Sequence, residues 1–188
     1  VKTLRDAYTV SFWFRNNLAN NARPVTAYLF SRGQDGDSRA PGDHLGIGGT
    51  STQADGTLFL FNGNVAKGSV GGKTVIAPGG WNHVVFLRSG SNVRAYLNGA
   101  TQPEFEGEIK STAAGSREIF IGGRNDRFAL LSGHVAHFTF FDRALTAKEA
   151  LQLHTASGQP KGSKTEPKES TKTVIAQADP KAQIEKVT

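Results

Sequence analysis

Trp81 to Gly99 read W-N-H-V-V-F-L-R-S-G-S-N-V-R-A-Y-L-N-G, and this stretch decides the fold. Over residues 84–87, apolar side chains fall on both faces of the extended chain, which is typical of a strand in the middle of a two-sheet stack. The chain then turns at residues 89–92 and returns along residues 93–97. Asn98-Gly99 is the dipeptide best suited to a tight turn with positive φ. The stretch therefore predicts a β-hairpin whose chemistry is packing and turning.

A second strand is predicted near the N-terminus, where polar and apolar side chains alternate from Tyr8 to Arg15. Further strands are expected at 27–31, 44–48, 57–62, 73–76, 82–88, 93–97, 118–121 and 133–142. Glycine-rich turns such as Asp55-Gly56 separate several of them. Short strands at regular spacing favour an all-β protein, namely a two-sheet antiparallel jelly-roll sandwich.

One short helix is expected at the end of the domain. Thr146 can cap it, and Glu149, three residues later, completes a capping box. After Gly158 the chain is rich in Lys, Glu, Thr, Ser, Gln and Pro, and such a segment buries too little apolar surface to offset its ordering entropy. We therefore expect one domain over residues 1–158 and a flexible linker or tail over residues 159–188.

Composition excludes several classes of protein. The chain has no cysteine, so it holds neither a disulfide framework nor a thiolate metal site. Its net charge of +6 comes from basic residues scattered among acidic ones, without the basic stripe that a nucleic-acid partner needs. No apolar run is long enough to cross a bilayer, so no membrane insertion is expected. The chain opens on Val1 rather than Met, which suggests a processed product or a piece of a larger protein.

Three blocks, in this order and at these spacings, resemble laminin-G-like modules (LamG type 3) of the concanavalin A-like lectin/glucanase superfamily. Residues 8–15, Y-T-V-S-F-W-F-R, are similar to the T-V-S-F-W-V strand of these modules. Residues 81–99 are similar to W-x-H-V-A…V-x-x-Y-V-D/N-G. The closing I-G-G…F-x-G-x-I-D-E-V…R-A-L-T-x-x-E-I block is matched by I-F-I-G-G at 119–123, G-H-V-A-H-F at 133–138 and A-L-T-A-K-E at 144–149.

The resemblance implies a non-catalytic accessory domain that lies outside the cytoplasm, in an extracellular, periplasmic or cell-surface protein. It implies glycans or protein surfaces as partners, together with neighbouring domains of a larger chain. Compared with these modules, the sequence is expected to lack the first strand. Ala136 stands where they often place an aspartate that helps to hold calcium, and alanine offers no ligand oxygen. No cofactor is expected apart from a possible calcium ion.

Asp35, Asp37 and Asp43 suggest a different calcium site, in a loop that also holds glycine and serine. Their carboxylates are the hard oxygen ligands that calcium takes. An ordinary polar connection explains the same residues, because Asp, Gly and Ser are common turn formers.

Arg124, Asn125, Asp126 and Arg127 are the predicted binding residues, in a loop after Gly122-Gly123. Such side chains can bind sugar hydroxyls or a carboxylate through directional hydrogen bonds. An internal Arg–Asp pair is the alternative. Trp13 offers a second possibility, a sugar-stacking platform, against the commoner role of tryptophan in packing.

Glu104, Glu106 and Glu108 alternate along a predicted strand, so their carboxylates would line one face. The spacing resembles the E-x-D-x-E of laminarinase- and lichenase-type glycosidases, except that the middle residue is Glu. A retaining glycosidase needs two carboxyl groups about 5–5.5 Å apart. A solvated acidic edge strand is the alternative.

The histidines give little indication of a metal. His134 and His137 are three residues apart, which places them on opposite faces of a strand. His83 falls at a position typical of the core. The sequence thus favours a glycan-binding or protein-binding module with no assigned catalytic residue. A structural inter-domain module is the first alternative, and a glycoside hydrolase that uses the glutamate strand is the second.

Overall fold

Two antiparallel five-stranded sheets face each other in the computed structural model, which describes residues 6–51, 55–112, 116 and 118–160. Sheet A has the strand order β10-β1-β6-β7-β8, and sheet B has the order β5-β4-β3-β2-β9. The predicted all-β sandwich with one short helix is confirmed. The elements are β1 (Ala7–Asn16), β2 (Val25–Gly33), β3 (Gly42–Gly48), β4 (Leu58–Phe61), β5 (Ser69–Gly71), β6 (Trp81–Ser89), β7 (Asn92–Leu97), β8 (Phe105–Glu108), β9 (Ile119–Ile121), β10 (Gly133–Phe141) and α1 (Ala147–Ser157).

The predicted hairpin forms the centre of sheet A. Strand β6 pairs with β7 on one side and with β1 on the other. Val84 and Phe86 point into the space between the sheets, and Val85 and Leu87 point outward, where they are also buried. The turn after β7 has positive φ at both Asn98 (51°) and its following glycine (72°), as the dipeptide predicts.

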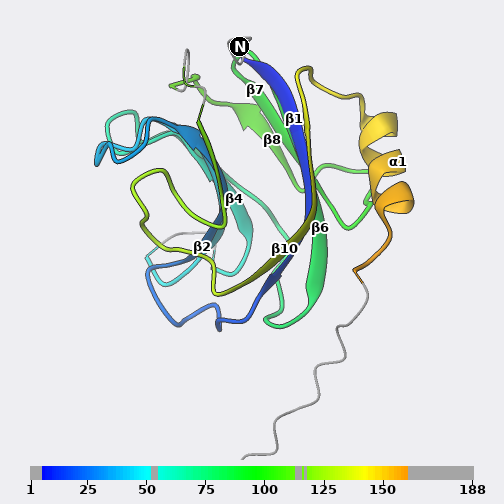
Figure 1. Cartoon of the computed structure of the whole chain (residues 1–188), viewed down its shortest axis with the longest axis horizontal. Coiled ribbons are helices and arrows are strands. Elements are labelled where there is room, and N and C mark those ends of the chain that lie inside the picture. Colours follow the sequence, from blue (N-terminus) through cyan, green and yellow to red (C-terminus); the bar gives the residue numbers. More distant parts are fainter. Residues whose placement is uncertain (1–5, 52–54, 113–115, 117, 161–188) are drawn as a thin grey trace, which may run out of the picture.

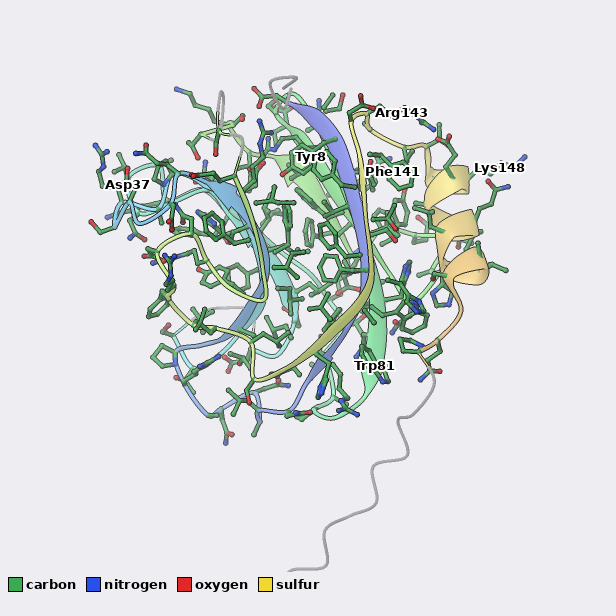
Figure 2. All side chains as sticks on the ribbon, in the orientation of Figure 1. Tyr8, Asp37, Trp81, Phe141, Arg143 and Lys148 are labelled. Atoms are coloured by element: carbon green, nitrogen blue, oxygen red, sulfur yellow. The ribbon has the colours of Figure 1, made fainter. Side chains whose placement is uncertain are left out.

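Aromatic side chains fill the space between the sheets (Figure 2). Tyr8 stacks on Phe140 with ring centroids 5.6 Å apart, and Phe12 stacks on Phe138 at 5.7 Å. Burial of these rings removes a large apolar area from water and is the main stabilisation of the sandwich. The core thus joins β1 to the edge strand β10 through side-chain packing as well as backbone hydrogen bonds.

A buried ion pair lies within this core. Arg88 donates to both carboxylate oxygens of Asp43, at 2.8 and 2.5 Å, and the Tyr8 hydroxyl donates to the same carboxylate at 2.7 Å. All three side chains are fully or almost fully buried, and burial raises the pKa of Tyr8. The pair bridges β3 of sheet B and β6 of sheet A, so it fixes how the sheets sit on each other.

Helix α1 covers the outer face of sheet A, on the far side of the molecule from β2 and β4 (Figure 1). The predicted capping box is present: Thr146 accepts from the Glu149 backbone, and the Glu149 side chain accepts from the Thr146 backbone. Ala150 packs with Val85 and Leu87 of β6 in a small apolar cluster. The part of this face that carries Val85 is therefore covered by α1.

One predicted strand is wrong. Residues 73–76 form no strand, and β5 comes earlier, at Ser69–Gly71. Ile76 is buried without being part of a strand; its N–H donates to the Gly56 carbonyl at 2.7 Å. Of the predicted tail, residues 161–188 lie outside the described residues. No helix in the described part of the chain is long and apolar enough to cross a membrane.

Candidate functional site

The outer face of sheet B carries a groove of about 610 Å³. Its floor follows from strand register, because residues paired across antiparallel strands point to the same side. One row across the sheet joins Tyr28, Gly46, Phe59 and Gly71. The lining residues are Val25, Tyr28, Ser51, Phe59, Phe61, Asn64, Ser69, Gly71, Gly72, Arg124 and Phe128.

Gly46 allows the floor to form. A Cβ at this position would lie 2.8 Å from the Phe59 ring and 2.7 Å from the Ala27 carbonyl oxygen, both closer than real Cβ atoms approach. Without a side chain at Gly46, the Phe59 ring lies close over β3 and meets the Tyr28 ring edge-on, with centroids 5.6 Å apart. The floor is thus apolar and aromatic.

One wall of the groove is the loop between β9 and β10. A hydrogen bond of 2.9 Å from the Tyr28 N–H to the Ala129 carbonyl ties this loop to β2. The Arg124 guanidinium lies over two neighbouring rings, 5.3 Å from the Tyr28 centroid and 4.8 Å from the Phe128 centroid. Phe128 is 46% exposed, which leaves part of its ring open to a ligand.

Arg124 is paired with Asp126 on the same loop. Its Nε donates to Oδ1 at 2.7 Å and its Nη2 to Oδ2 at 2.6 Å, a bidentate geometry. Partial burial by itself raises the pKa of Asp126, but the hydrogen bonds from Arg124 and the Phe128 N–H, together with the charge of Arg124, outweigh it and leave that pKa below its usual value. Burial raises the pKa of Tyr28, so its hydroxyl keeps its proton at neutral pH. The groove therefore combines aromatic surface with a charge-neutral Arg–Asp pair.

The four predicted binding residues take different places. Arg124 lines the groove, and Asp126 holds it there. Asn125 is fully buried and donates to the Gln34 carbonyl at 2.6 Å, so it anchors the loop instead. Arg127 points to Asp35, at 2.7 Å, and does not line the groove.

The sequence did not identify the aromatic residues of the groove. Tyr28, Phe59 and Phe61 alternate with core residues along their strands, so their pattern is that of any two-sided strand. Phe128, two residues after the predicted Asp126, had no signal beyond its position in a loop.

The three aspartates of the predicted calcium site do not come together. Asp43 lies in the core and is bonded to Arg88, away from any surface loop. Asp37 pairs with Arg39 at 2.8 Å, and Asp35 pairs with Arg127. In the parts of the chain that the structure describes, no group of three or more His, Asp or Glu side chains is placed to hold a metal ion.

The three glutamates predicted to share a strand face have two different environments. Glu104 precedes β8 and accepts hydrogen bonds from the Lys73 and Thr74 amides, at 2.5 and 2.6 Å, and from the Thr74 hydroxyl at 2.8 Å. It therefore holds the turn at residues 73–74. Glu106 is exposed and pairs with Arg94 across β7 and β8, and Glu108 is exposed beside it. Only Glu106 and Glu108 reach a shared hollow, of about 390 Å³.

Trp13 is covered by α1 and is 5% exposed. Its indole Nε1 donates to the Ser157 hydroxyl at 2.9 Å, and its ring packs 5.1 Å from that of His83. His83 is buried between sheet A and the helix, and it shares a hydrogen bond of 3.0 Å with the Ser11 hydroxyl. Trp13 is thus a packing residue, and a ligand cannot reach its faces.

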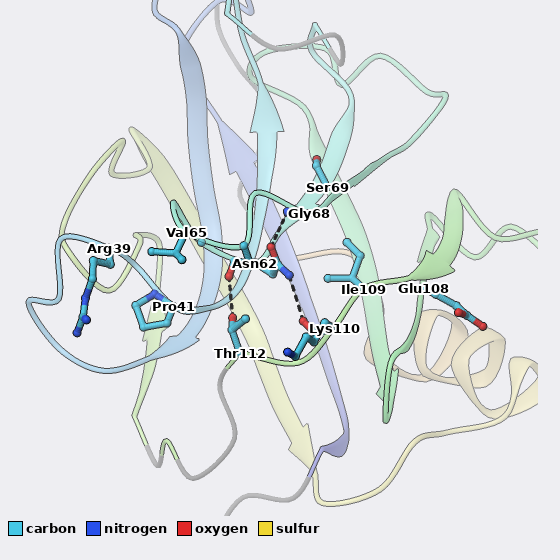
Figure 3. A pocket seen from close by; sticks show the side chains of 12 residues that line it. Arg39, Pro41, Asn62, Val65, Gly68, Ser69, Glu108, Ile109, Lys110 and Thr112 are labelled. Carbon is cyan, nitrogen blue, oxygen red and sulfur yellow. Dashed lines mark hydrogen bonds between the residues drawn. The ribbon is translucent and has the colours of Figure 1, made fainter.

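A second hollow, of about 750 Å³, lies where the loop after β4 meets the segment after β8 (Figure 3). Its central polar groups bond to each other: Asn62 binds the Gly68 N–H and the Lys110 carbonyl, and Thr112 donates to the Asn62 carbonyl. No aromatic side chain is among its lining residues in the described part of the chain. The groove on sheet B therefore has the stronger chemistry for recognition.

Two facing antiparallel sheets make the protein a β-sandwich, and the open outer face of sheet B carries an aromatic-lined groove. Residues 1–150 match the family Laminin_G_3, described as the concanavalin A-like lectin/glucanases superfamily. The chain belongs to this family, as the three sequence blocks predict. No curated protein matches the chain by sequence.

Solved structures of similar fold include several carbohydrate-binding modules. The CBM40 module of the Ruminococcus gnavus IT-sialidase, solved with α2,3-sialyllactose, has 13% identity and a TM-score of 0.59, over 79% of this chain and 83% of that one. Domain 4 of AbnA, a GH43 extracellular arabinanase from Geobacillus stearothermophilus solved with arabinotriose, has 21% identity and a TM-score of 0.57, over 79% and 66%. A heptameric SAP-like pentraxin from Limulus polyphemus has 21% identity and a TM-score of 0.60, over 81% and 71%.

Proposed function

We propose that the chain is a non-catalytic glycan-binding module whose ligand lies in the groove on the outer face of sheet B. The observation that carries the proposal is the partly exposed ring of Phe128 above a floor of aromatic rings. Sugar rings present C–H faces that pack on aromatic rings, while their hydroxyls need a few fixed polar groups. Ser69 and Asn64 at the groove edge supply such groups.

The absence of a catalytic role is part of the proposal. Glu104 uses its carboxylate to hold the turn at residues 73–74, and Glu106 is bonded to Arg94. A glycosidase needs an acid and a nucleophile or base that flank one glycosidic bond. The groove on sheet B has no carboxylate among its described lining residues. Its chemistry is therefore that of binding.

The neighbours of similar fold support a glycan as the ligand, because two of them were solved with bound sugars. One of these belongs to an extracellular enzyme. We accordingly place this module in a secreted, periplasmic or cell-surface protein, as an accessory to other domains. Its first task there is to hold the parent protein near a polysaccharide.

A glycan array followed by calorimetric titration tests the proposal. The wild-type protein should retain at least one class of oligosaccharide, and Phe128→Ala should weaken that binding about tenfold or more, as expected for a stacking residue. Val65→Ala is the matched control, because Val65 is also exposed and apolar but lines the second hollow. Equal binding by Phe128→Ala and wild type would place the ligand elsewhere.

A structural inter-domain module is the second candidate, favoured by apolar residues at the edge of the sandwich. Ile121 and Leu130 are 49% and 52% exposed, and β9 and the loop after it carry them. Such a patch marks a surface that another protein surface covers. Ile121→Ser with Leu130→Ser should then detach this domain from its neighbour in the parent chain, as limited proteolysis would reveal, without changing retention on the array.

A further inference from the structure

We propose that the groove on sheet B selects neutral oligosaccharides and discriminates against sugars that carry a carboxylate. This inference rests on the proposed function and names the chemical class of its ligand. The two sugar complexes of similar fold differ on this point, since sialyllactose is acidic and arabinotriose is neutral. The charges around the groove distinguish the two cases.

Arg124 is the only charged side chain among the described lining residues of the groove. An acidic sugar would need its guanidinium as a bidentate partner. However, the edge formed by Nε and Nη2 already binds both oxygens of Asp126, at 2.7 and 2.6 Å. One of the two bidentate edges of the guanidinium is therefore occupied from within the loop, by a carboxylate that also neutralises its charge.

Asp126 also opposes a second carboxylate electrostatically. Its charge lies beside that of Arg124, so an incoming anion meets a pair whose net charge is zero. The pair is largely buried, with side-chain exposures of 8% and 15%, and solvent screens it less than a surface pair. An acidic sugar would lose hydration at its carboxylate and gain no compensating charge in return.

Two other arginines, Arg127 and Arg23, are bonded elsewhere in the fold. Arg127 is paired with Asp35 at 2.7 Å. Arg23, just before Val25, is bonded to the backbone carbonyls of Thr26 and Leu130. Neither arginine is among the residues that line the groove.

What the groove offers instead suits uncharged sugars. Arg124 lies over both Tyr28 and Phe128, and these contacts hold the Phe128 ring at the groove. The ring supplies a stacking surface, and the hydroxyls of Ser51 and Ser69 and the amide of Asn64 supply uncharged hydrogen-bond partners. Arg124 is in this account a positioning residue for the aromatic wall.

The test compares binding of neutral and acidic glycans to the whole chain. The neutral probes are arabino-, xylo- and gluco-oligosaccharides, and the acidic probes are α2,3-sialyllactose and oligogalacturonate. Methyl-esterified oligogalacturonate is the matched neutral form of the latter, because the two differ only in the carboxyl groups. We expect retention of neutral probes, an affinity for the ester at least about tenfold above that for the free acid if this backbone is bound, and binding that is insensitive to salt.

Two variants test the cause. Asp126→Asn keeps an acceptor for Arg124 but removes the charge, so it should raise affinity for the acidic probes about tenfold at low salt. Asp35→Asn is the matched control: it frees Arg127, which lies outside the groove, and should leave the preference unchanged. Should Asp126→Asn fail to fold, the salt dependence of the wild type decides the question alone.

The outcomes separate this inference from the function beneath it. Preferential, salt-sensitive binding of acidic probes, lost in Phe128→Ala, would overturn the neutral-sugar inference and leave the glycan-binding groove intact. Binding of no probe in either class would overturn both. A gain of acidic binding in Asp35→Asn equal to that in Asp126→Asn would show that general surface charge, and not the groove pair, sets the preference.

Discussion

On the outer face of sheet A, Trp13 lies beneath α1 and is 5% exposed, whereas at the outer face of sheet B, Phe128 stands beside an open groove and is 46% exposed. Both faces carry aromatic side chains outside the main core. The two aromatic residues differ in what covers them: α1 lies over Trp13, whereas the described elements leave the groove beside Phe128 open. An aromatic side chain therefore stabilises the fold on one face and is available for recognition on the other.

Removing the covered aromatic side chain, Trp13, should have the largest effect on the free energy of unfolding. Trp13→Ala leaves a cavity between sheet A and α1, so the free energy of unfolding should fall by about 3–5 kcal/mol. Urea unfolding measures this loss. Glycan affinity of the folded fraction should stay that of the wild type, because the groove lies on the opposite sheet.

Phe128→Ala should have the opposite pattern of effects, with a small change in stability and a large change in glycan binding. A half-exposed loop residue contributes less to the fold than a buried one, so stability should fall by about 1 kcal/mol or less while glycan binding weakens about tenfold or more. If Phe128→Ala destabilised the protein as much as Trp13→Ala does, the two faces would not differ in the way described.

Gly46 tests whether the groove depends on its floor. Gly46→Ala places a Cβ 2.8 Å from the Phe59 ring, and the forced shift should cost about 1–3 kcal/mol and weaken glycan binding. Chemical denaturation and calorimetry measure the two effects. Gly80→Ala is the control, because a Cβ there has nothing closer than 3.8 Å, and both stability and binding should remain unchanged.

Acid should weaken the covered face of sheet A. Burial, followed by the charge of His154, lowers the pKa of His83 to about 4 from a usual 6.5. Below pH 6.5 the unfolded chain binds a proton that folded His83 does not, so stability is lost as pH falls from about 6.5 towards 4.

His44, buried beside the floor of the groove, has a pKa of about 4 for the same first reason and contributes in the same direction. Urea midpoints measured across this pH range should show the loss of stability. Each histidine adds at most about 1.4 kcal/mol per pH unit to the slope. His83→Gln should make the slope shallower without abolishing it, and an unchanged slope would show that His83 is not the titrating group.

Calcium should have no effect, the smallest of these outcomes. Asp43 is held by Arg88 in the core, and the other two predicted ligands pair with separate arginines. A ligand that binds only the folded state must raise the melting temperature. Equal melting temperatures with millimolar calcium and with chelator are expected, and a rise with calcium would reveal a site formed by other oxygens.

The scaffold was predictable from the sequence because it depends on local patterns. The two-sided apolar run around Val85 marks a central strand, and Thr146 with Glu149 marks the start of the helix. The sequence did not predict which buried residues lie outside helices and strands. Ile76 has the apolar character of a strand residue, yet it fills the core from a segment that forms no strand.

The site was predictable only in part. Arg124 belongs to a polar loop and could be singled out, but its neighbour Asn125 looks equally suited to binding and instead anchors the loop from within. Trp13 and Phe59 both alternate with core residues, and alternation does not tell which outer face a helix will cover. The choice between packing and recognition depends on where α1 docks, which is a property of the whole fold.

An NMR titration with the glycan retained by the wild type tests the central claim most directly, because it observes both faces at once. The amide signals of Gly46, Gly71 and Gly72 report on the groove, and the indole signal of Trp13 reports on the covered face beneath α1. We predict that the glycine amides shift with saturation while the Trp13 indole does not move. A shift of the Trp13 indole with unchanged groove glycines would contradict the account.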